Sequence, residues 1–405
     1  MERFAHLGPL DRRRMLQGSL ALGGFAASGL AGCAELGGRH QAQLSLTDQV
    51  PPLAPIRARL DRLFDITVCL RPFRAAGPRI EPEQIGDTRV IHNYGHGGSG
   101  WSLSWGSSTL AVRMAMQSSP RGIAVVGCGA LGLTSAILAQ GAGAKVTIYA
   151  RDLLPQTRSA RATGSWTPDS RIALASVAGP AFGERWEEMA RISFKTYRSY
   201  LGLPGDPVEW TDRYYLNDAL PGATPSPPAP GALDFANYQD RVRDIMPKAE
   251  VLPPGSTPFP APVVRRATQM QFNIADYGHT LMSDFLAAGG TFRRAEFHAP
   301  SDLAALREKV VINCPGYGAR ELMKDESIVP VRGQIGWLIP QPEVHYGLYY
   351  DGVSVVARRD GIVVQMLEGG DMSGYNDANE TVDRAESETA VGRLAELYER
   401  MAKAG

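Results

Sequence analysis

Cysteine is scarce in this sequence, and neither sign of charge prevails. The 405 residues include four cysteines, and Lys plus Arg equals Asp plus Glu at 42 each. Cys69, Cys128 and Cys314 are widely spaced, which predicts packed thiols rather than a disulfide framework or a zinc site. The balanced charge excludes a global field that would favour nucleic acid or an anionic surface. Because 44% of the residues are hydrophobic, the chain can bury a large core, and its length predicts two lobes.

The first 57 residues predict export. Asp11-Arg12-Arg13-Arg14-Met15-Leu16 precedes an uncharged stretch from Gln17 to Gly32, as in a twin-arginine signal. The stretch ends at Leu30-Ala31-Gly32-Cys33, which is similar to a bacterial lipoprotein processing site. We therefore expect residues 1–33 to be a signal and Cys33 to carry lipid in the periplasm or cell envelope. Residues 34–57 would be a linker. The alternative interpretation of the uncharged stretch from Gln17 to Gly32 is a buried helix of the folded protein.

A glycine-rich turn, Val125-Val126-Gly127-Cys128-Gly129-Ala130-Leu131-Gly132, lies between a predicted strand and a predicted helix. The β-branched run Ile123–Val126 precedes it, and the helical pattern Leu131–Ala139 follows it. In such a unit the first glycine allows a tight turn, the second lets a pyrophosphate approach and the third lets the helix pack closely. The helix N-terminus adds unpaired N–H groups and a partial positive charge.

A second strand, Lys145–Tyr149, completes the βαβ pattern and is followed by an acid at the spacing of a ribose ligand. These features predict a dinucleotide site, and the alternative is an ordinary strand–turn–helix. The expected cofactor-binding residues here are Gly127, Cys128, Gly129, Ala130, Leu131, Gly132, Arg151 and Asp152.

The rest of the chain alternates between helical and strand patterns without an internal repeat. We expect helices at Ile274–Ala288 and Thr381–Lys403 and strands at Lys309–Asn313 and Gly333–Leu338. Two proline-rich loops, Leu216–Leu233 and Pro253–Pro262, should lack regular ladders. This alternation predicts an α/β nucleotide domain interleaved with a strand-rich domain.

A second glycine-rich segment precedes the nucleotide turn: His92-Asn93-Tyr94-Gly95-His96-Gly97-Gly98-Ser99-Gly100-Trp101. His92 and His96 are four residues apart, but the glycines around them predict a loop rather than a helix that presents metal ligands. We therefore expect no metal site.

This segment resembles the D-amino-acid oxidase family of FAD-dependent enzymes. So do Leu70-Arg71-Pro72-Phe73-Arg74, Val311–Gly316, Arg332–Ile335 and a set of positions from Pro155 to Pro168. The resemblance extends over most of residues 60–400. It implies an α/β fold in which a Rossmann-like FAD-binding domain is interleaved with a strand-rich α+β substrate-binding domain. The expected ranges are 88–185 and 272–330 for the first, and 58–87, 186–271 and 331–405 for the second.

The order of the segments differs from that of the family. Its usual members place the nucleotide turn near the N-terminus and the segments that resemble residues 70–74 and 92–100 near the C-terminus. We therefore expect a circular permutation, in which Met114–Arg121 joins the family's usual ends. The new ends would lie at Gly405 and about Leu60. Such a change is physically reasonable because domain termini commonly lie close together.

The resemblance implies roles for particular residues. Arg71 should bind the substrate carboxylate through a charge-assisted, two-pronged contact, whereas Arg74 should be structural. A helix over Ser107–Gln117 should stabilise negative charge on a reduced flavin, and Gln334 should lie in a strand near the domain interface. The further residues expected at the FAD are Gly97, Gly98, Ser99, Gly100, Trp101, Ser102, Thr157, Ser159, Gly164 and Ser165.

Several positions depart from the family pattern. Arg151 stands where the family has its ribose acid, and Pro315 stands where it has a hydroxyl residue. The family's active-site tyrosines have no clean match, because Val356 stands where one of them would be. Three tyrosines fall in the corresponding region: Tyr346, Tyr349 and Tyr350. The expected catalytic residues are Arg71, Gly98, Tyr346 and Tyr349. Arg358 and Arg359 would favour an acidic substrate, or are simply exposed.

The function implied by the resemblance is oxidation of D-amino acids. The products would be 2-oxo acids, ammonia and, with oxygen as acceptor, hydrogen peroxide. One alternative is a flavin dehydrogenase that passes electrons to a membrane carrier. Another is a non-catalytic FAD protein that binds amino acids. A nicotinamide-dependent reductase is disfavoured, because it has no role for the His92–Gly106 segment.

Overall fold

The computed structural model describes residues 52–218 and 231–404. The chain divides into Met1–Thr47 and Asp48–Gly405, and every described residue belongs to the second unit. The expected signal at 1–33, most of the linker at 34–57 and most of the first proline-rich loop lie outside the described residues. Within the described part, no helix is long and apolar enough to cross a bilayer.

A six-stranded sheet carries both glycine-rich segments. Its order is β2-β3-β10-β4-β5-β9, and β3, β10, β4, β5 and β9 run parallel. The strands are β2 (Pro82–Ile85), β3 (Thr88–His92), β4 (Gly122–Val126), β5 (Lys145–Ala150), β9 (Thr291–Arg294) and β10 (Val310–Asn313). Since β2 pairs with β3, the sheet also includes Pro82–Ile85, which precede the expected start of this domain at residue 88. Strands buried on both faces explain the continuous apolar runs of β4 and β10.

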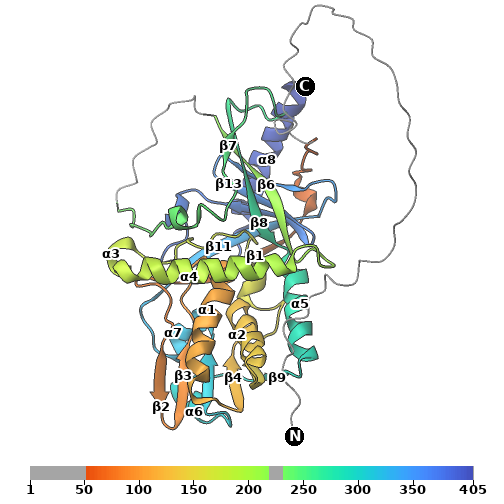
Figure 1. The fold of residues 1–405 in the computed structure, drawn as a ribbon. Coiled ribbons are helices and arrows are strands. Elements are labelled where there is room, and N and C mark those ends of the chain that lie inside the picture. The colour runs from red at the N-terminus through yellow and green to blue at the C-terminus, as the bar shows by residue number, and fades with distance from the viewer. Residues whose placement is uncertain (1–51, 219–230, 405) are drawn as a thin grey trace, which may run out of the picture. The chain divides into compact units, whose positions relative to one another are not determined.

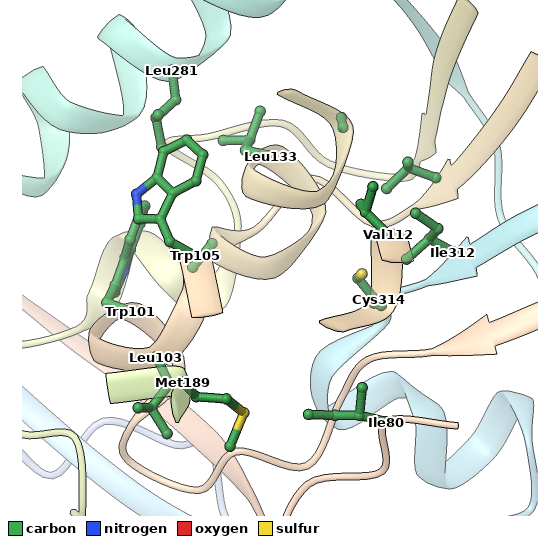
Figure 2. Close-up of a cluster of buried hydrophobic side chains, with 14 of the residues drawn as sticks. Ile80, Trp101, Leu103, Trp105, Val112, Leu133, Met189, Leu281, Ile312 and Cys314 are labelled. Carbon is green, nitrogen blue, oxygen red and sulfur yellow. The ribbon is translucent and has the colours of Figure 1, made fainter. Parts of the chain in front are cut away.

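Helices cover both faces of this sheet. The core on one face joins buried side chains of β3, β4, β5 and β10 to α1 (Gly100–Ala115), α2 (Ala130–Gly141), α4 (Pro180–Tyr197) and α5 (Ile274–Ala287). The other face packs on α6 (Pro300–Ala304) and α7 (Ala319–Leu322). Figure 1 shows α4 crossing over the ends of α1 and α2. Figure 2 shows Trp105 of α1 directed between Leu133 of α2 and Leu281 of α5, and its indole N–H donates to the Tyr277 hydroxyl at 2.7 Å.

Helix α1 begins earlier than expected. It starts at Gly100, immediately after the glycine-rich segment, rather than at Ser107. Five small residues of its first turns, among them Ser104 and Gly106, are buried against neighbouring helices, and a Cβ on Gly106 would lie 2.1 Å from the Met189 carbonyl oxygen of α4. Close packing therefore makes helical a stretch whose glycine and serine content predicted a loop.

A second, eight-stranded sheet has the order β1-β11-β14-β13-β12-β6-β8-β7. Its strands are β1 (Leu63–Arg74), β6 (Val208–Asn217), β7 (Glu250–Val251), β8 (Val263–Phe272), β11 (Ile328–Leu338), β12 (Tyr346–Tyr350), β13 (Val353–Arg358) and β14 (Gly361–Met366). Helix α8 (Arg384–Ala404) packs on one face through β11, β13 and β14. The remaining helix is the short α3 (Ala175–Ala178).

Residues just before β1 also pack on this sheet. Ile56 is 2% exposed in the core that includes α8, and the Tyr346 hydroxyl donates to the Ala54 carbonyl oxygen at 2.8 Å. The Tyr346 hydroxyl also lies 2.8 Å from the Tyr398 hydroxyl of α8. The described part of the expected linker is therefore ordered against the strand-rich domain from Ala54 onward.

Candidate active site

A groove of about 1170 Å³ runs along the carboxyl edge of the six-stranded sheet. Both glycine-rich turns open into it, because β3 and β4 are parallel to β10 and end at the same edge. Its walls also include Cys69–Pro72 of β1, residues 156–163 and residues 295–298 and 314–318. The volume exceeds the about 300–1,000 Å³ of ordinary small-ligand sites, as an extended dinucleotide requires.

The turn after β4 has no room for side chains. Gly127 has φ +95°, and a Cβ there would lie 2.3 Å from the Cys314 carbonyl oxygen. A Cβ on Gly132 would lie 2.0 Å from the Gly127 carbonyl oxygen, so only glycine lets α2 approach the turn. No acidic residue lies in the first turn of α2, and its N-cap residue, Gly129, has no side chain to cap it. Its N–H groups and positive end therefore suit an anion such as a phosphate.

Two hydroxyl residues of the segment that follows β5 line the groove, and one of them reaches this helix terminus. The Ser159 hydroxyl accepts a hydrogen bond from the Ala130 N–H at 3.1 Å. The Thr157 hydroxyl is buried without a partner among the described residues, although Thr157 lines the groove. An orphaned hydroxyl beside a helix N-terminus fits a bound phosphate oxygen, which would satisfy it.

The acid after β5 is engaged by its neighbour. The Arg151 Nε lies 2.8 Å from an Asp152 carboxylate oxygen, and both residues line the groove. The hydrogen bond with Asp152 raises the pKa of Arg151. The other oxygen of Asp152 forms no hydrogen bond with the described residues, so it can accept one from a ligand hydroxyl.

The turn after β3 is as tightly packed as the first. Gly97 has φ +54°, and a Cβ there would lie 1.9 Å from the Arg171 carbonyl oxygen. A Cβ on Gly98 would lie 2.4 Å from the Ser170 hydroxyl. The Gly97 N–H donates to the Pro72 carbonyl oxygen at 2.8 Å. These contacts hold the turn against β1 and leave a side-chain-free surface facing the groove.

His96 presents an acceptor to the groove. The Ser107 hydroxyl donates to the Asn93 side-chain oxygen at 2.5 Å, so the His96 Nε2, 2.7 Å from that hydroxyl, must donate to it. The His96 Nδ1 then carries a lone pair, and it is buried with no hydrogen-bond partner in the part of the chain that the structure describes. Burial lowers the pKa of His96 to about 3, so the ring is neutral. An unpaired acceptor in the groove wall fits a donor group on a bound cofactor.

Two arginines adjoin the turn after β3. The guanidinium of Arg71 lies over Gly333 of β11 and donates to the Arg332 carbonyl oxygen at 3.2 Å. No carboxylate of the described residues forms an ion pair with it. The buried Arg171 donates to the carbonyl oxygens of Gly370 and Asp371 at 2.9 and 2.7 Å. Burial, and then the nearby Arg71, lower the pKa of Arg171 to about 10, so Arg171 remains a cation at neutral pH.

The structure corrects one expected catalytic tyrosine. Because side chains alternate along β12, Tyr346 and Tyr350 belong to the core beneath α8, while Tyr349 faces the opposite side. The Tyr346 hydroxyl is held by Ala54 and Tyr398, and Tyr346 does not line the groove. Tyr346 is therefore wrong as a catalytic candidate. Tyr349 is half-buried on the face that also carries Arg71.

The two arginines of the β13–β14 hairpin are not available to a substrate. Arg358 is 4% exposed, forms an ion pair with Asp360 and donates to the Ala162 carbonyl oxygen at 2.7 Å. Arg359 is exposed and forms an ion pair with Asp206. Neither side chain therefore supports the earlier suggestion that this pair favours an acidic substrate.

Most of the other expected site residues line the groove. Those that do are Arg71, Gly97, Gly98, Gly100, Trp101, Gly127, Cys128, Gly129, Ala130, Leu131, Arg151, Asp152, Thr157 and Ser159. The wall does not include Ser99, Ser102, Gly132, Gly164, Ser165 and Tyr349. The Ser99 hydroxyl instead donates to the Ser170 carbonyl oxygen, and the Ser102 hydroxyl accepts from the Thr167 N–H.

Sequence analysis missed several residues of the groove and its rim. Arg158 forms an ion pair with Glu380 and lies over the Tyr317 ring. These residues come from three distant segments, so no local motif signals them. The cysteines of the described part, Cys69, Cys128 and Cys314, are free and buried, and burial raises the pKa of Cys128 and of Cys314 to about 12, so both are protonated. No cluster of His, Cys, Asp and Glu in the described residues has the form of a metal site.

Comparison with known proteins indicates that the cofactor of this groove is FAD. A model of the FAD-dependent oxidoreductase family, DAO, matches residues 122–404. D-amino-acid oxidase of Streptomyces coelicolor is 29% identical over 230 residues, which are 55% of this chain and 60% of that protein. D-amino-acid oxidase of Rubrobacter xylanophilus is 30% identical over 214 residues, 52% of this chain and 57% of that protein. The chain thus spans about three fifths of the length of these relatives.

Among solved structures, glycine oxidase from Geobacillus kaustophilus superposes with a TM-score of 0.49 at 15% identity, covering 69% of this chain and 79% of that one. The family match confirms the expected α/β fold with a Rossmann-like FAD-binding domain and the expected FAD cofactor. The orphaned Thr157 hydroxyl and His96 Nδ1, together with the two side-chain-free turns, fit that group. The chain belongs to the DAO family of FAD-dependent oxidoreductases.

Proposed function

We propose that this protein oxidises D-amino acids to imino acids, which hydrolyse to 2-oxo acids and ammonia, while oxygen is reduced to hydrogen peroxide. The observation that carries the proposal is Arg71, a cation without a carboxylate partner among the described residues, in the wall of the groove that fits FAD. Curated relatives named D-amino-acid oxidase support the choice of substrate.

The residues present divide the work between binding and positioning. Arg71 binds the substrate carboxylate through two charge-assisted hydrogen bonds. FAD, when bound, supplies the acceptor for the hydride from the substrate Cα. Gly97 and Gly98 let the turn pack directly against Ser170 and Arg171, and both line the groove in which the substrate Cα and amine would approach the cofactor. Gly97 also fixes the turn on β1 through Pro72, which places the turn beside Arg71 and so aligns the reacting atoms.

The test is the anaerobic visible spectrum of the FAD-loaded protein mixed separately with D- and L-amino acids. We expect bleaching by D-forms alone, reversed by air with release of peroxide. Bleaching by neither series would overturn the proposal. Bleaching by D-forms with no peroxide in air, but with reduction of a dye, would assign the electrons to another acceptor.

We also propose the circular permutation. The family match begins at β4 and leaves out β1, β3 and α1, which contain the segments resembling the family's C-terminal part. Residues 54–56 and α8 pack together through Tyr346 and Tyr398, which supports a junction there. A chain re-ordered to begin at Gly122, with residues 58–118 placed after Ala404, should fold and bind FAD. Failure to fold with several joining linkers would argue against the permutation.

Export and lipid attachment remain proposals from the sequence. Their support is the Arg12-Arg13-Arg14 cluster and the Leu30–Cys33 segment. A Cys33→Ser substitution should move the protein from the membrane fraction to the soluble periplasmic fraction. An unchanged membrane fraction would contradict lipid attachment at Cys33.

A further inference from the structure

Arg213 is a buried cation that the proposed reaction does not yet use. It lies on β6, is 8% exposed and has a 2.5 Å hydrogen bond from its Nη2 to the Ser354 hydroxyl of β13. Its Nε is buried and has no hydrogen-bond partner within residues 52–218 and 231–404. No carboxylate of the described residues forms an ion pair with it, and the neighbouring ionisable groups are the hydroxyls of Tyr215 and Tyr349.

An arginine in this state is costly to the fold. Taking a guanidinium out of water without a counter-ion costs several kcal/mol, and an arginine stays charged in proteins. Its planar face lies 5.5 Å from the centre of the Tyr215 ring, which offsets part of this cost. The remaining unpaired N–H groups would be satisfied by an anion that is not part of the described chain.

Arg213 and Arg71 lie on the same face of the eight-stranded sheet. Residues paired across a ladder share a face, and the pairings connect Arg213 with Gly347 of β12, then Val356 and Val363. The core of Val356 and Val363 includes Ile335 and Trp337 of β11. Ile335 is two residues from Gly333, over which Arg71 lies. Helix α8 covers the opposite face.

Each of these two arginines bends over a glycine toward the middle of the sheet. Arg71 crosses from β1 over Gly333, and the Arg213 side chain passes over Gly347, where a Cβ would lie 3.2 Å from its Cγ. Only β14 separates β11 from β13. At a strand spacing of about 4.8 Å, the two guanidinium groups lie roughly 10 Å apart across the strands.

That separation suits two carboxylates of one small molecule. A carboxyl carbon lies about 4 Å from the guanidinium carbon that binds it, and the two carboxyl carbons of aspartate or glutamate are about 4–5 Å apart. Two guanidinium-to-carboxyl distances and one carboxyl-to-carboxyl distance add up to about 12–13 Å when they lie in line. This span exceeds the distance between the two guanidinium groups across the strands, so it also allows for their offset along the strand direction.

From this geometry we propose that Arg213, with the Ser354 hydroxyl, binds the side-chain carboxylate of the substrate. The preferred substrates are then acidic D-amino acids, and Arg213 determines specificity at the site where Arg71 binds the α-carboxylate. This inference rests on the proposed oxidase function and names its substrate class. The Tyr215 ring lies against the Arg213 guanidinium, and Tyr349 is the other ionisable neighbour of that group.

The experiment compares acids with their uncharged amides in the FAD-loaded enzyme. We expect kcat/KM for D-Asp and D-Glu to exceed that for D-Asn and D-Gln by about 10–100-fold, as for a site built around a substrate polar group. Arg213→Met should lower kcat/KM for the acids about 100-fold and for the amides less than about threefold. Arg213→Lys should keep part of the preference, because it keeps the charge without the planar fork.

The matched control is Arg359→Gln, which removes an exposed arginine paired with Asp206 at the β13–β14 hairpin. It should leave the acid-to-amide ratio unchanged. Equal losses for acids and amides in the Arg213 variants, or a wild-type enzyme that prefers amides, would overturn the inference while leaving the oxidase intact.

A binding readout separates this inference from the oxidase proposal. Succinate and its monoamide, succinamate, differ only in the second charge. Succinate should raise the melting temperature of the wild-type protein more than succinamate does, and Arg213→Met should abolish the difference. If no D-amino acid reduces the flavin but this difference is present, the anion site stands and the oxidase proposal fails. If succinate and succinamate stabilise the wild-type protein equally, the anion site fails, whatever the rate of turnover. Because this comparison uses the wild-type protein, it remains decisive even if an Arg213 variant does not fold.

Discussion

Glycine-to-alanine substitution at two positions of α2 should have opposite effects. Gly132 and Gly141 both lie in this helix, but a Cβ on Gly132 would lie 2.0 Å from the Gly127 carbonyl oxygen, whereas a Cβ on Gly141 has no atom within 4 Å. A Cβ contact shorter than 3.0 Å is essentially never found. The Gly132→Ala substitution therefore requires α2 and the turn after β4 to separate by about 1 Å.

The two costs can be estimated from known effects. Overpacking of this kind costs about 1–3 kcal/mol, whereas replacing glycine in an unobstructed helix stabilises by about 0.5–1 kcal/mol. At about 2–4 °C per kcal/mol, Gly132→Ala should lower the melting temperature by several degrees and Gly141→Ala should raise it by about 1–3 °C. If the N–H groups at the start of α2 bind the FAD phosphates as the sequence predicts, Gly132→Ala should also weaken FAD binding about tenfold.

Two assays are needed. Thermal unfolding of the cofactor-free protein measures stability, and a titration with FAD, monitored by the quenching of flavin fluorescence, measures cofactor affinity. A Gly132→Ala protein with wild-type affinity for FAD would refute the assignment of this turn to the cofactor phosphates. Stabilisation by both substitutions would refute the packing argument itself.

Three further predictions concern single side chains of the groove. Arg71→Met should lower kcat/KM for D-amino acids about 100-fold, whereas Arg74→Met, which loses contacts with Ser327 and Asp325, should lower the melting temperature and leave KM near its original value; equal effects on KM would contradict the two roles. Thr157→Val should weaken FAD binding about five- to tenfold in an equilibrium titration without destabilising the cofactor-free protein, since the lost hydroxyl has no partner there; unchanged affinity would remove Thr157 from the site. His96 has a pKa of about 3 in the folded protein and about 6.5 when unfolded, so the free energy of unfolding should fall by about 2 kcal/mol between pH 6.5 and pH 5 as the unfolded chain takes up a proton. Denaturant unfolding of His96→Gln should therefore depend less on pH over this range than unfolding of the wild-type protein. An identical pH dependence would show that His96 does not titrate in this way.

The local part of the nucleotide site could be predicted from the sequence. Gly127, Gly129 and Gly132 act within one strand–turn–helix, so their spacing carries the information. The position of Tyr346 could not be predicted in the same way. Alternation tells that Tyr346 and Tyr349 face opposite sides, but only the packing of α8 decides which side is closed.

Arg213 shows why long-range features escape sequence analysis. Its strand is predicted by no motif, and its importance depends on Gly347 and Ser354, more than 130 residues away in the chain. Burial without a counter-ion is a property of the assembled sheet. Likewise, the early start of α1 at Gly100 depends on its packing against α4.

The place of β10 in the six-stranded sheet has a consequence for synthesis of the protein. Residues 310–313 fill the slot between β3 and β4, which precede them by about 190–220 positions. Until the ribosome has made that segment, β2–β3 and β4–β5–β9 are two half-sheets without a shared hydrogen-bonded ladder. Such non-local pairing is slow to form. A nascent chain therefore has no complete flavin cradle before most of its length has emerged, and cofactor loading must follow translation of β10.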